Sequence, residues 1–557
     1  MMRSFFSFIL LVLVFTRTAD AQSLRPGEWR TYTSMRSVAD VALSEDSQYV
    51  WAATSGGAFR VKLIDRTDIL QLRNSNGLSD NELTAVAVDA SGNTYFGGRS
   101  GSLDIWSRTS GTIRQERSIM DIREFGQKSI NDIVIDGDRV YLATGYGLTV
   151  YNSRTRAFGE TVVAFGTFPS QEAVQQVIIL RDTIYAVLSR GVAYTPTSTF
   201  NLNNPASWNT ITSTDGTLSK GTQYLGDIYV GGDSGLKRVD VSLAQLTSVG
   251  VAADVPVAQL AVQGASMYLI DPRGTSQLGT TASFGPITWR AIPRDRAEIN
   301  SINALALGRD GLVIAGTTLT GLLIGIQNGD SVDQAFPSGP NSNSVEDLDF
   351  AVSRSKLFTT HGDLGASVFD PEQDVWLEYP RTDPRLPPVG YRRVLFDSIS
   401  NVAWFGLSGQ GVMKAQGMET GNITYQLYDK EDGLPSSDAA NGNYVIGGKG
   451  MLNNKGEFVA TAWASDGRGL SFYQSNNTFN SVSLGNVYST YGKVAQDFGG
   501  TYWVGTESNT NPAPYGLFFY SSSGLSGSLF GGPGGILSSA SVNALVVDQD
   551  NTLWVGT

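Results

Sequence analysis

Residues 83–106 have the sequence LTAVAVDASGNTYFGGRSGSLDIW, which contains the unit from which the fold is built. Apolar side chains alternate over Leu83–Val88, which predicts a strand with one face in a core. Asp89 and Gly92 then predict a tight turn, because Asp accepts backbone N–H groups and Gly takes positive φ. A second strand follows at Tyr95. In other copies, Gly and an apolar run open a third strand, as in Gly147-Leu-Thr-Val-Tyr151.

The second strand of this unit recurs along the whole chain. An aromatic or aliphatic anchor leads into another apolar residue, then Gly or Ala and often Thr. Twelve anchors lie 39 to 54 residues apart: Trp51, Tyr95, Tyr141, Tyr185, Tyr229, Tyr268, Val313, Leu357, Trp404, Phe458, Trp503 and Trp554. Four short strands with their turns use about 40–50 residues, which is the period of a β-propeller blade. We expect the anchors to pack between blades rather than to stack on a ligand.

The number of repeats predicts two rings, because one ring usually holds at most about eight blades. The fold class is therefore all-β, with two consecutive β-propellers of four-stranded antiparallel blades. The first is expected over 22–327, with seven blades and with a strand near 29–33 completing the last one. Residues 328–344 are polar, contain two prolines and form the expected linker. The second propeller, 345–557, is expected to hold about five blades and to be truncated, with its C-terminal blades and any β-sandwich domain missing. Alternatively, the boundary lies elsewhere and the second ring is small.

Residues 1–21 have the parts of a secretory signal peptide. Arg3 supplies the positive charge, Phe5–Phe15 is the apolar core, and Ala19-Asp20-Ala21 is a cleavage site of the A-x-A type. The apolar core is shorter than the about 20 residues of a comfortable membrane span. The mature protein is therefore expected to be exported.

The composition excludes several classes of site. There is no Cys, so disulfides, thiol catalysis and Cys-ligated metals are ruled out. A single histidine, His361, cannot form a multi-histidine metal centre, and a Ser-His-Asp triad would have to include it. With 40 Lys and Arg against 52 Asp and Glu, the net charge of −12 argues against nucleic acid as a partner. No catalytic, cofactor-binding or metal-ligating residue is predicted, no cofactor is expected, and the ligand-binding residues stay unknown.

Two kinds of residue still deserve a structural test. His361 occupies the small-residue position after an anchor strand, where a side chain can line an axial opening. Three acidic pairs could suggest calcium binding: Asp136 with Asp138, Asp548 with Asp550, and Glu431 with Asp432. These pairs lack the closing bidentate Glu of a calcium loop, so hairpin turns are the better interpretation.

Two stretches resemble known families. Asp432-Gly-Leu-Pro-Ser436 and its relative Asn76-Gly-Leu-Ser-Asp80 resemble the two-component-regulator propeller repeat, found in exported proteins of the Bacteroidetes. Residues 76–158 resemble more specifically the N-terminal propeller of the PorZ family, through the order of NGLSD, GSLDIW, KSIN and YLATGYGL. That resemblance implies a non-enzymatic scaffold of the type IX secretion attachment complex at the outer-membrane surface. It implies PorU-like sortase and PorV- and PorQ-like partners, and an anionic lipopolysaccharide as the anchor to which cargo is joined.

Two other functions remain open. The chain can be the periplasmic, glycan-sensing propeller region of a hybrid two-component histidine kinase, in which case a spanning helix and a kinase would follow residue 557. Alternatively, it can be a carbohydrate-active propeller enzyme, which predicts carboxylates and arginines converging in one axial funnel.

Overall fold

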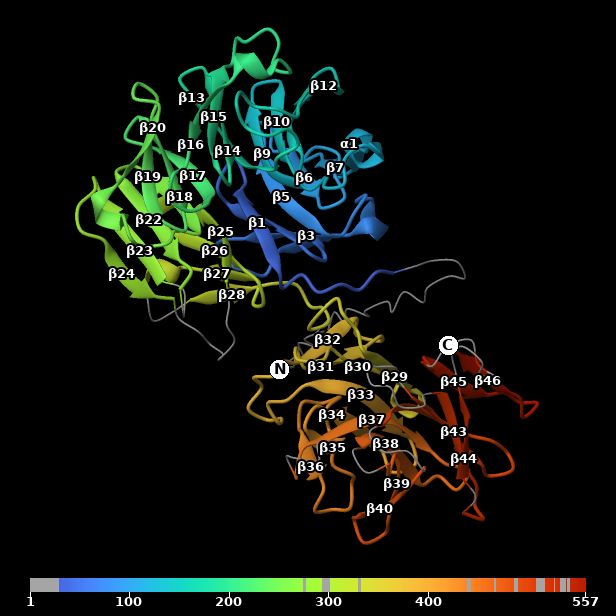
Figure 1. Ribbon diagram of the computed structural model, residues 1–557. Helices are drawn as coiled ribbons and strands as arrows, with labels where there is room; N and C mark the ends of the chain where they lie inside the picture. The colour runs from blue at the N-terminus through green and yellow to red at the C-terminus, as the bar shows by residue number, and fades with distance from the viewer. Residues whose placement is uncertain are drawn as a thin grey trace, which may run out of the picture.

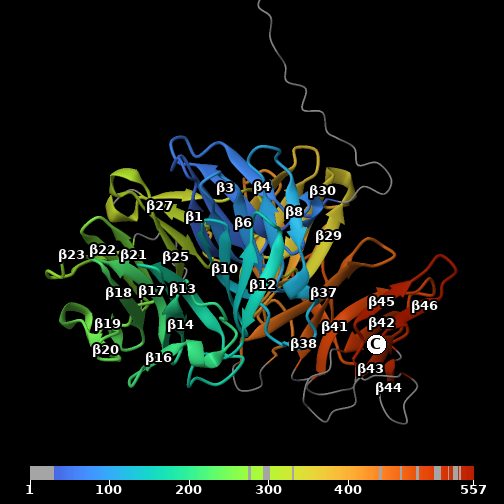
Figure 2. The ribbon, with the colours of Figure 1, turned by 90° about the horizontal axis from the view of Figure 1, so that it is seen from above.

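The computed structural model describes residues 30–273, 277–292, 301–328, 332–437, 442–464, 467–484, 489–506, 516–524, 526–530, 537 and 541–557. It has two lobes of radiating antiparallel sheets, which are joined at a waist (Figure 1) and overlap in part when they are seen from above (Figure 2). The predicted all-β fold of propeller blades is confirmed. The signal peptide predicted for residues 1–21 lies outside the described residues.

Within the described residues, the first propeller consists of seven sheets, each made of four consecutive strands. Their strands are β1–β4 (Val38–Leu43, Tyr49–Thr54, Gly57–Lys62, Ile69–Leu72), β5–β8 (Leu83–Val88, Thr94–Gly98, Leu103–Trp106, Ile113–Glu116), β9–β12 (Ile130–Asp136, Arg139–Thr144, Gly147–Asn152, Ala157–Val162), β13–β16 (Val174–Leu180, Thr183–Leu188, Gly191–Pro196, Asn209–Thr212), β17–β20 (Leu218–Tyr224, Asp227–Gly232, Gly235–Asp240, Gln245–Ser248), β21–β24 (Gln259–Gln263, Ser266–Asp271, Gln277–Ala282, Thr288–Ala291) and β25–β28 (Ile302–Leu307, Val313–Thr317, Leu322–Ile324, Asp333–Ala335). Short helical turns interrupt the loops: α1 (Ser118–Asp121), η1 (Asn74–Asn76), η2 (Pro205–Ser207), η3 (Gly250–Ala252), η4 (Arg309–Gly311), η5 (Ile326–Asn328) and η6 (Val352–Arg354).

The circle closes differently from the sequence prediction. Inner strand β1 lies beside β25, so the first and last sheets share a hydrophobic core. The outer strand of the last sheet is β28, which comes from within the segment predicted as linker, so the expected boundary at 327 and the linker 328–344 are wrong. The described part of the predicted closing strand, residues 30–33, is not a strand. Because β28 already fills the outer position, the N-terminal segment is free to contact the second propeller instead.

The second propeller contains, in the described part of the chain, four blades of four strands and one hairpin; the second to fourth of these blades are linked into one twelve-stranded sheet. The strands are β29–β32 (Asp347–Ala351, Lys356–Thr360, Ala366–Asp370, Val375–Tyr379), β33–β36 (Tyr391–Asp397, Val402–Leu407, Gln410–Gln416, Thr424–Tyr428), β37–β40 (Val445–Leu452, Phe458–Ala464, Leu470–Tyr473, Phe479–Val482), β41–β44 (Ser489–Gln496, Tyr502–Thr506, Gly516–Tyr520, Ser526–Phe530) and β45–β46 (Ala544–Val547, Leu553–Gly556). Short pairings of β35 with β37 and of β38 with β41 join neighbouring blades.

All twelve anchors lie on the second strand of a blade. Trp51 packs against Phe96 and Trp106 of the next blade, with ring centroids 5.4 and 5.0 Å away. Trp404 stacks on Phe458 of the following blade at 4.0 Å. These contacts place the rings between blades, as predicted for them, since aromatic pairs add to the burial of apolar surface.

Polar side chains also join neighbouring blades, at bulges in the inner strands. Four bulge residues each donate a hydrogen bond to a backbone carbonyl at or just before the start of the next inner strand. These bonds run from Thr84 to Ile130 (2.6 Å), from Asn131 to Val174 (2.8 Å), from Ser219 to Val257 (3.0 Å) and from Asn303 to Val38 (2.8 Å). The last of them crosses from the seventh blade to the first and so helps to close the ring. Each bond satisfies a carbonyl that would otherwise be costly to bury.

Candidate functional site

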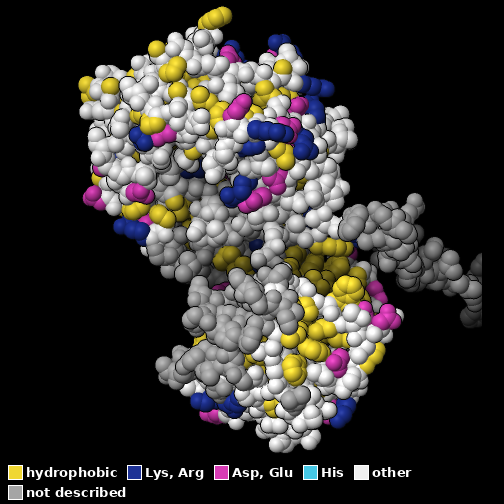
Figure 3. Space-filling view, turned by 45° about the vertical axis from the view of Figure 1, so that its right-hand side comes forward, with side chains coloured by type: hydrophobic (Ala, Val, Ile, Leu, Met, Phe, Trp, Pro, Cys, Tyr) yellow, Lys and Arg dark blue, Asp and Glu magenta, His cyan; other side chains and the backbone are white. Residues whose placement is uncertain are grey.

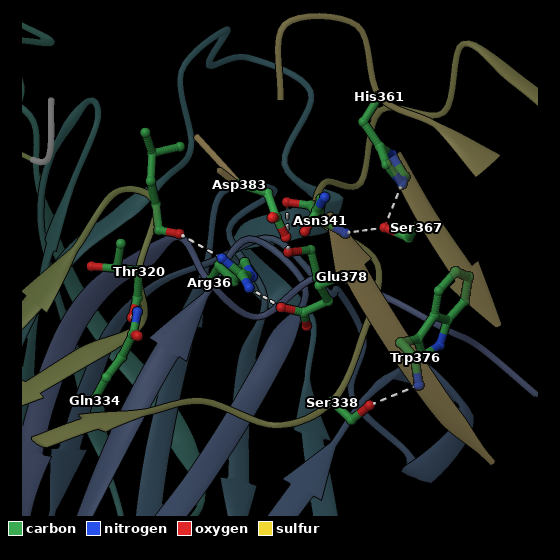
Figure 4. A network of polar contacts seen from close by, with 12 residues as sticks. Arg36, Thr320, Gln334, Ser338, Asn341, His361, Ser367, Trp376, Glu378 and Asp383 are labelled. Carbon is green, nitrogen blue, oxygen red and sulfur yellow. Dashed lines mark hydrogen bonds and ion pairs between the residues drawn. The ribbon is translucent and has the colours of Figure 1, made fainter. Parts of the chain in front are cut away.

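The N-terminal segment is built into the junction between the two propellers. Arg36 is 6% exposed and forms an ion pair with Glu378 on β32 of the second propeller (Figure 4). Its guanidinium also lies over the ring of Phe336, 4.3 Å from the centroid. A buried charge needs such partners, because removing it from water is costly. Arg36 is therefore a fixed connection between the first propeller and the second.

The segment after β28 completes this connection. Ser34 N donates to Asn343 Oδ1 at 2.6 Å, and Asn343 Nδ2 donates back to the carbonyls of Ser34 and Ser55 at 3.2 and 3.1 Å. Asn341 donates through its backbone N to Ser367 Oγ at 3.0 Å (Figure 4). It also donates through Nδ2 to the Ala366 carbonyl at 2.7 Å. The chain entering the first propeller is therefore bonded to the chain leaving it, and the leaving chain is bonded to the second propeller.

Aromatic packing covers the same junction at the edge of the second propeller. The ring of Tyr32 lies 4.5 Å from that of Phe369, which stacks on Trp376 at 4.8 Å. The Tyr32 hydroxyl donates to Asp374 at 3.0 Å. In the space-filling view, hydrophobic side chains gather on the second propeller beside the waist (Figure 3). Polar and aromatic contacts thus act together to hold the two lobes.

A cleft of about 540 Å³ opens at this junction. It lies within the 300–1,000 Å³ range of ligand pockets, which often form between domains. Its walls come from both propellers and from the segment between them: Ser34, Arg36, Ser37, Ser55, Asp80, Asn81, Glu82, Thr318, Leu319, Asn341, Ser342, Asn343 and Leu364. We take this cleft as the candidate site. Sequence reasoning missed it: Asp80 ends the NGLSD motif, but no motif or spacing associates it with the other residues of the cleft.

His361 is part of the junction and not of an opening. It is 4% exposed; Nδ1 lies 3.0 Å from the Ser344 carbonyl, and Nε2 lies 3.0 and 3.1 Å from the hydroxyls of Thr359 and Ser367. Burial lowers the pKa of His361, so the ring is neutral near pH 7. A neutral ring that donates from Nδ1 to the carbonyl and accepts at Nε2 from the hydroxyls satisfies all of these hydrogen-bond partners. Its role is to hold the incoming chain against β30 and β31.

Charged side chains do converge where the inner strands of the first propeller meet. Asp40 and Asp132 accept backbone N–H groups from the next blade, those of Val86 and Val177, each at 2.9 Å. Both carboxyls reach solvent only in part, and burial raises the pKa of each, that of Asp40 to about 6. Lys220 lowers both pKa values through its charge. The described inner strands of this propeller contain no arginine, so the carboxylate and arginine funnel of a carbohydrate-active enzyme is not found at this axis.

The axis of the second propeller combines acids with bases, and its groups also join blades. Asp347 accepts from Val394 N at 3.0 Å and from Lys449 Nζ at 2.7 Å. Asp349 accepts from Phe396 N at 2.6 Å. These carboxylates are therefore engaged in contacts between blades.

The acidic pairs and the Leu-containing motifs have structural roles. Asp138 pairs with Arg154 at 3.1 Å, and Asp548 accepts from Trp554 Nε1 at 2.7 Å as well as from its own turn. Leu78 and Leu434, from the NGLSD and DGLPS motifs, are 2% and 1% exposed and fill equivalent positions between blades. No cluster of three or more potential metal ligands is found among the described residues.

The serine of the NGLSD motif binds a buried carboxylate. Asp104 is fully buried and accepts both the N–H and the hydroxyl of Ser79, each at 2.8 Å. Burial raises the pKa of Asp104 to about 6, and nearby Asp80 adds to this. The carboxyl is therefore ionised at pH 7.5 at a cost to stability, since its pKa in an unfolded chain is near 3.8.

Asp104→Asn is expected to stabilise the protein at pH 7.5 and to lose that advantage near pH 4. The folded protein binds a proton at Asp104 between about pH 6 and pH 4, so this group makes the wild type more stable as pH falls through that window. Two pKa units set an upper limit of about 3 kcal/mol. Denaturant unfolding of the variant and the wild type at pH 7.5 and at pH 4 measures the difference in their free energies of unfolding. Asp240→Asn is the control. Its stability relative to the wild type is expected to change with pH in the opposite direction, because hydrogen bonds from Ser242 lower the pKa of Asp240. A change in the same direction for both variants would contradict the prediction.

None of the helices in the described ranges has the length and apolar character needed to cross a bilayer.

Comparisons with known proteins agree with the resemblance read from the motifs. Residues 50–209 match the family model of the PorZ N-terminal beta-propeller domain of the type IX secretion system, and residues 536–557 match the two component regulator propeller. No curated protein matches the sequence. The extracellular domain of a hybrid two component system of B. thetaiotaomicron aligns with a TM-score of 0.43 at 13% identity, over 95% of this chain and 70% of that one.

A solved structure of PorZ from Porphyromonas gingivalis, described as an essential bacterial surface component of the type IX secretion system, aligns more closely. Its TM-score is 0.72 at 17% identity, over 95% of this chain and 72% of PorZ. The resemblance to the PorZ family is therefore confirmed: residues 50–209 are similar to its N-terminal propeller domain, and the chain shares the fold of P. gingivalis PorZ.

Proposed function

We propose that this protein is a non-enzymatic scaffold of a type IX secretion system, located at the outer-membrane surface. The observation that carries the proposal is the match of residues 50–209 to the PorZ N-terminal propeller family. The role within the system would be to help a PorU-like sortase join cargo to an anionic lipopolysaccharide anchor, alongside PorV- and PorQ-like proteins.

The geometry is compatible with holding partners. Two propellers present broad loop faces, and loops on a rigid framework are the usual place for binding residues. The junction fixes those faces relative to one another through the buried Arg36 and Glu378 pair and the bonds of Asn341 and Asn343. A scaffold needs such a fixed arrangement, because flexible linkage would add an entropic cost to binding two partners at once.

Co-purification from the source bacterium tests this proposal. A tagged copy expressed at its natural level is expected to bring down a sortase and PorV- or PorQ-like proteins from solubilised outer membranes. The matched control is the same tag on an unrelated exported protein. Failure to recover a sortase from a strain that secretes normally would contradict the proposal.

A periplasmic sensor region of a hybrid histidine kinase is the second candidate, favoured by the match of residues 536–557 to the two component regulator propeller. Protease added to intact cells distinguishes the surface scaffold from the periplasmic sensor. A surface scaffold is expected to be cleaved, whereas a periplasmic sensor is expected to be protected until the outer membrane is permeabilised.

A further inference from the structure

A second cavity of the protein, of about 490 Å³, lies between the second and third blades of the first propeller. Its walls come mainly from three turns: residues 89–93 between β5 and β6, residues 107–112 between β7 and β8, and residues 153–156 between β11 and β12. Arg114, Arg154 and Arg156 all line this cavity, which we call the arginine groove. Three guanidinium groups in one groove favour a negatively charged ligand.

The three arginines differ in how far their charge is already used. Arg114 forms an ion pair with Glu116 at 3.1 Å. Arg154 lies 3.1 Å from Asp138, but their side chains are 76% and 46% exposed, so this pair contributes little. Arg156 is exposed, and its side chain forms no hydrogen bond or ion pair with the described residues. Arg154 and Arg156 are therefore the two cations that can bind a ligand.

The surroundings of the groove oppose an anion only weakly. Asp89 is the one acidic residue that lines the groove in the described structure, and it already accepts Ser91 N at 2.8 Å, Asn93 N at 2.9 Å and Asn93 Nδ2 at 3.0 Å. Residues 99–156 contain nine Lys and Arg against seven Asp and Glu, in a chain with a net charge of −12. Lys and Arg side chains gather on one side of the first propeller in the space-filling view (Figure 3). This part of an otherwise acidic protein therefore attracts acidic partners.

The backbone of the groove argues against a free phosphate as the occupant. Phosphate sites are usually built from converging backbone N–H groups. Most N–H groups of the turn 153–156 are used within the protein: Ser153 N donates to the Asp138 carbonyl at 2.8 Å, Thr155 N to Asn152 Oδ1 at 2.7 Å, and Arg156 N to the Asn152 carbonyl at 2.8 Å. Only the arginine side chains are left to hold an anion, which suits exposed carboxylates.

A strand edge runs beside the arginines. β8 is the outer strand of the second blade, and no strand of the described structure pairs with its outer side. Thr112 and Arg114 are two residues apart and both line the groove, so they share one side of this strand. Arg114 also reaches across to the Tyr151 hydroxyl of the third blade at 2.9 Å. An extended chain paired with β8 would present every second side chain to the same side.

We infer that the arginine groove binds an extended, acidic peptide segment of a partner protein, which pairs with the outer edge of β8 and places alternate carboxylates against Arg154 and Arg156. A peptide uses both the strand edge and the two cations, whereas a small anion uses the cations alone. The inference rests on this groove and not on the secretion role, so either can fail without the other.

Fluorescence anisotropy of the purified mature protein tests this inference. The probe is a labelled peptide of about ten residues, the upper length of a typical strand, in which Glu alternates with Thr. At low salt we expect a Kd of about 100 μM or lower, and weaker binding at high salt because the contacts are exposed. The analogue with Lys in place of Glu is expected not to bind. No binding of the Glu peptide, equal binding of the Lys peptide, or complete displacement by equimolar inorganic phosphate or polygalacturonate would overturn the inference.

Two variants with the same change in charge locate the binding site. Arg156→Glu is expected to weaken binding of the Glu peptide at least about tenfold, because repulsion replaces attraction. Arg181→Glu is the matched control and is expected to change binding by less than about twofold. Arg181 is also exposed and also has a positive φ, of 47°, but it lies in the turn between β13 and β14 of the fourth blade. Equal effects of the two variants would show that only net charge matters and would overturn the assignment.

Hydrogen exchange tests the pairing with β8. Addition of the Glu peptide is expected to slow exchange in Ile113–Glu116, because an added strand takes up N–H groups of the free edge. Unchanged exchange in β8 while the peptide is bound would overturn the proposed mode of binding.

Discussion

Glu378→Ala is expected to separate the unfolding of the two propellers and to destabilise the protein by about 3–5 kcal/mol. The substitution removes the carboxylate partner of Arg36, whose side chain is 7% exposed, while the guanidinium stays buried over Phe336. A buried charge that loses its partner is far more costly than an exposed one. Differential scanning calorimetry should show two unfolding transitions in the variant. The transition with the lower melting temperature is expected to differ most from the melting temperature of the wild type.

An exposed ion pair provides the control for this experiment. Arg66 and Asp333 lie 3.1 Å apart, with side chains 25% and 65% exposed, and connect the first blade to β28. Arg66→Ala is expected to cost less than about 1 kcal/mol. The double variant Arg36→Met, Glu378→Leu is expected to recover most of the loss, because apolar side chains can replace a buried pair. If Glu378→Ala and Arg66→Ala gave the same melting curve, the importance assigned to the buried ion pair would be refuted.

Gly147→Ala is expected to destabilise the third blade by about 2–6 kcal/mol. Gly147 opens β11 with φ +146°, which a residue with a Cβ rarely adopts. A Cβ there would overlap the carbonyl oxygen of Val162, at the end of the outer strand β12. Backbone strain and overpacking each cost about 1–3 kcal/mol, and here they add. Hydrogen exchange should show loss of protection first in β11 and β12.

Gly126→Ala is the matched control. A Cβ at Gly126 meets no atom within 4 Å, and its φ is not in the left-handed region. This variant should melt within about a degree of the wild type. Equal melting temperatures for the two variants would mean that β12 can move away from β11 without cost, which would contradict the steric explanation.

The repeat could be predicted from the sequence because its signals are local. Asp89 and Gly92 determine a hairpin from four residues, and an anchor such as Tyr95 follows at fixed spacing. The position of the closing strand could not be predicted in the same way. Asp333–Ala335 is short, and its outer edge position depends on pairing with β27, which no local pattern reports. Residues 30–33 have a similar composition to outer strands but have other partners.

The candidate site was even less accessible to sequence reasoning. The bond between Ser34 and Asn343 joins residues 309 positions apart, and Asn341, Ser37 and Asp80 carry no spacing signal that would associate them. His361 is a candidate from the sequence because it is the sole histidine, yet its surroundings show a structural role. Rarity of a residue type is therefore not by itself evidence of a functional role.

The bond between Ser34 and Asn343 also has a mechanical consequence. The chain enters and leaves the first propeller at one place, so a pull along the chain loads the contacts of Ser34, Arg36 and Asn343 first. The blades of the first propeller lie outside that line of force. As long as these contacts hold, tension applied to the chain would pass from the N-terminal segment directly to the second propeller, and the first ring would keep its shape.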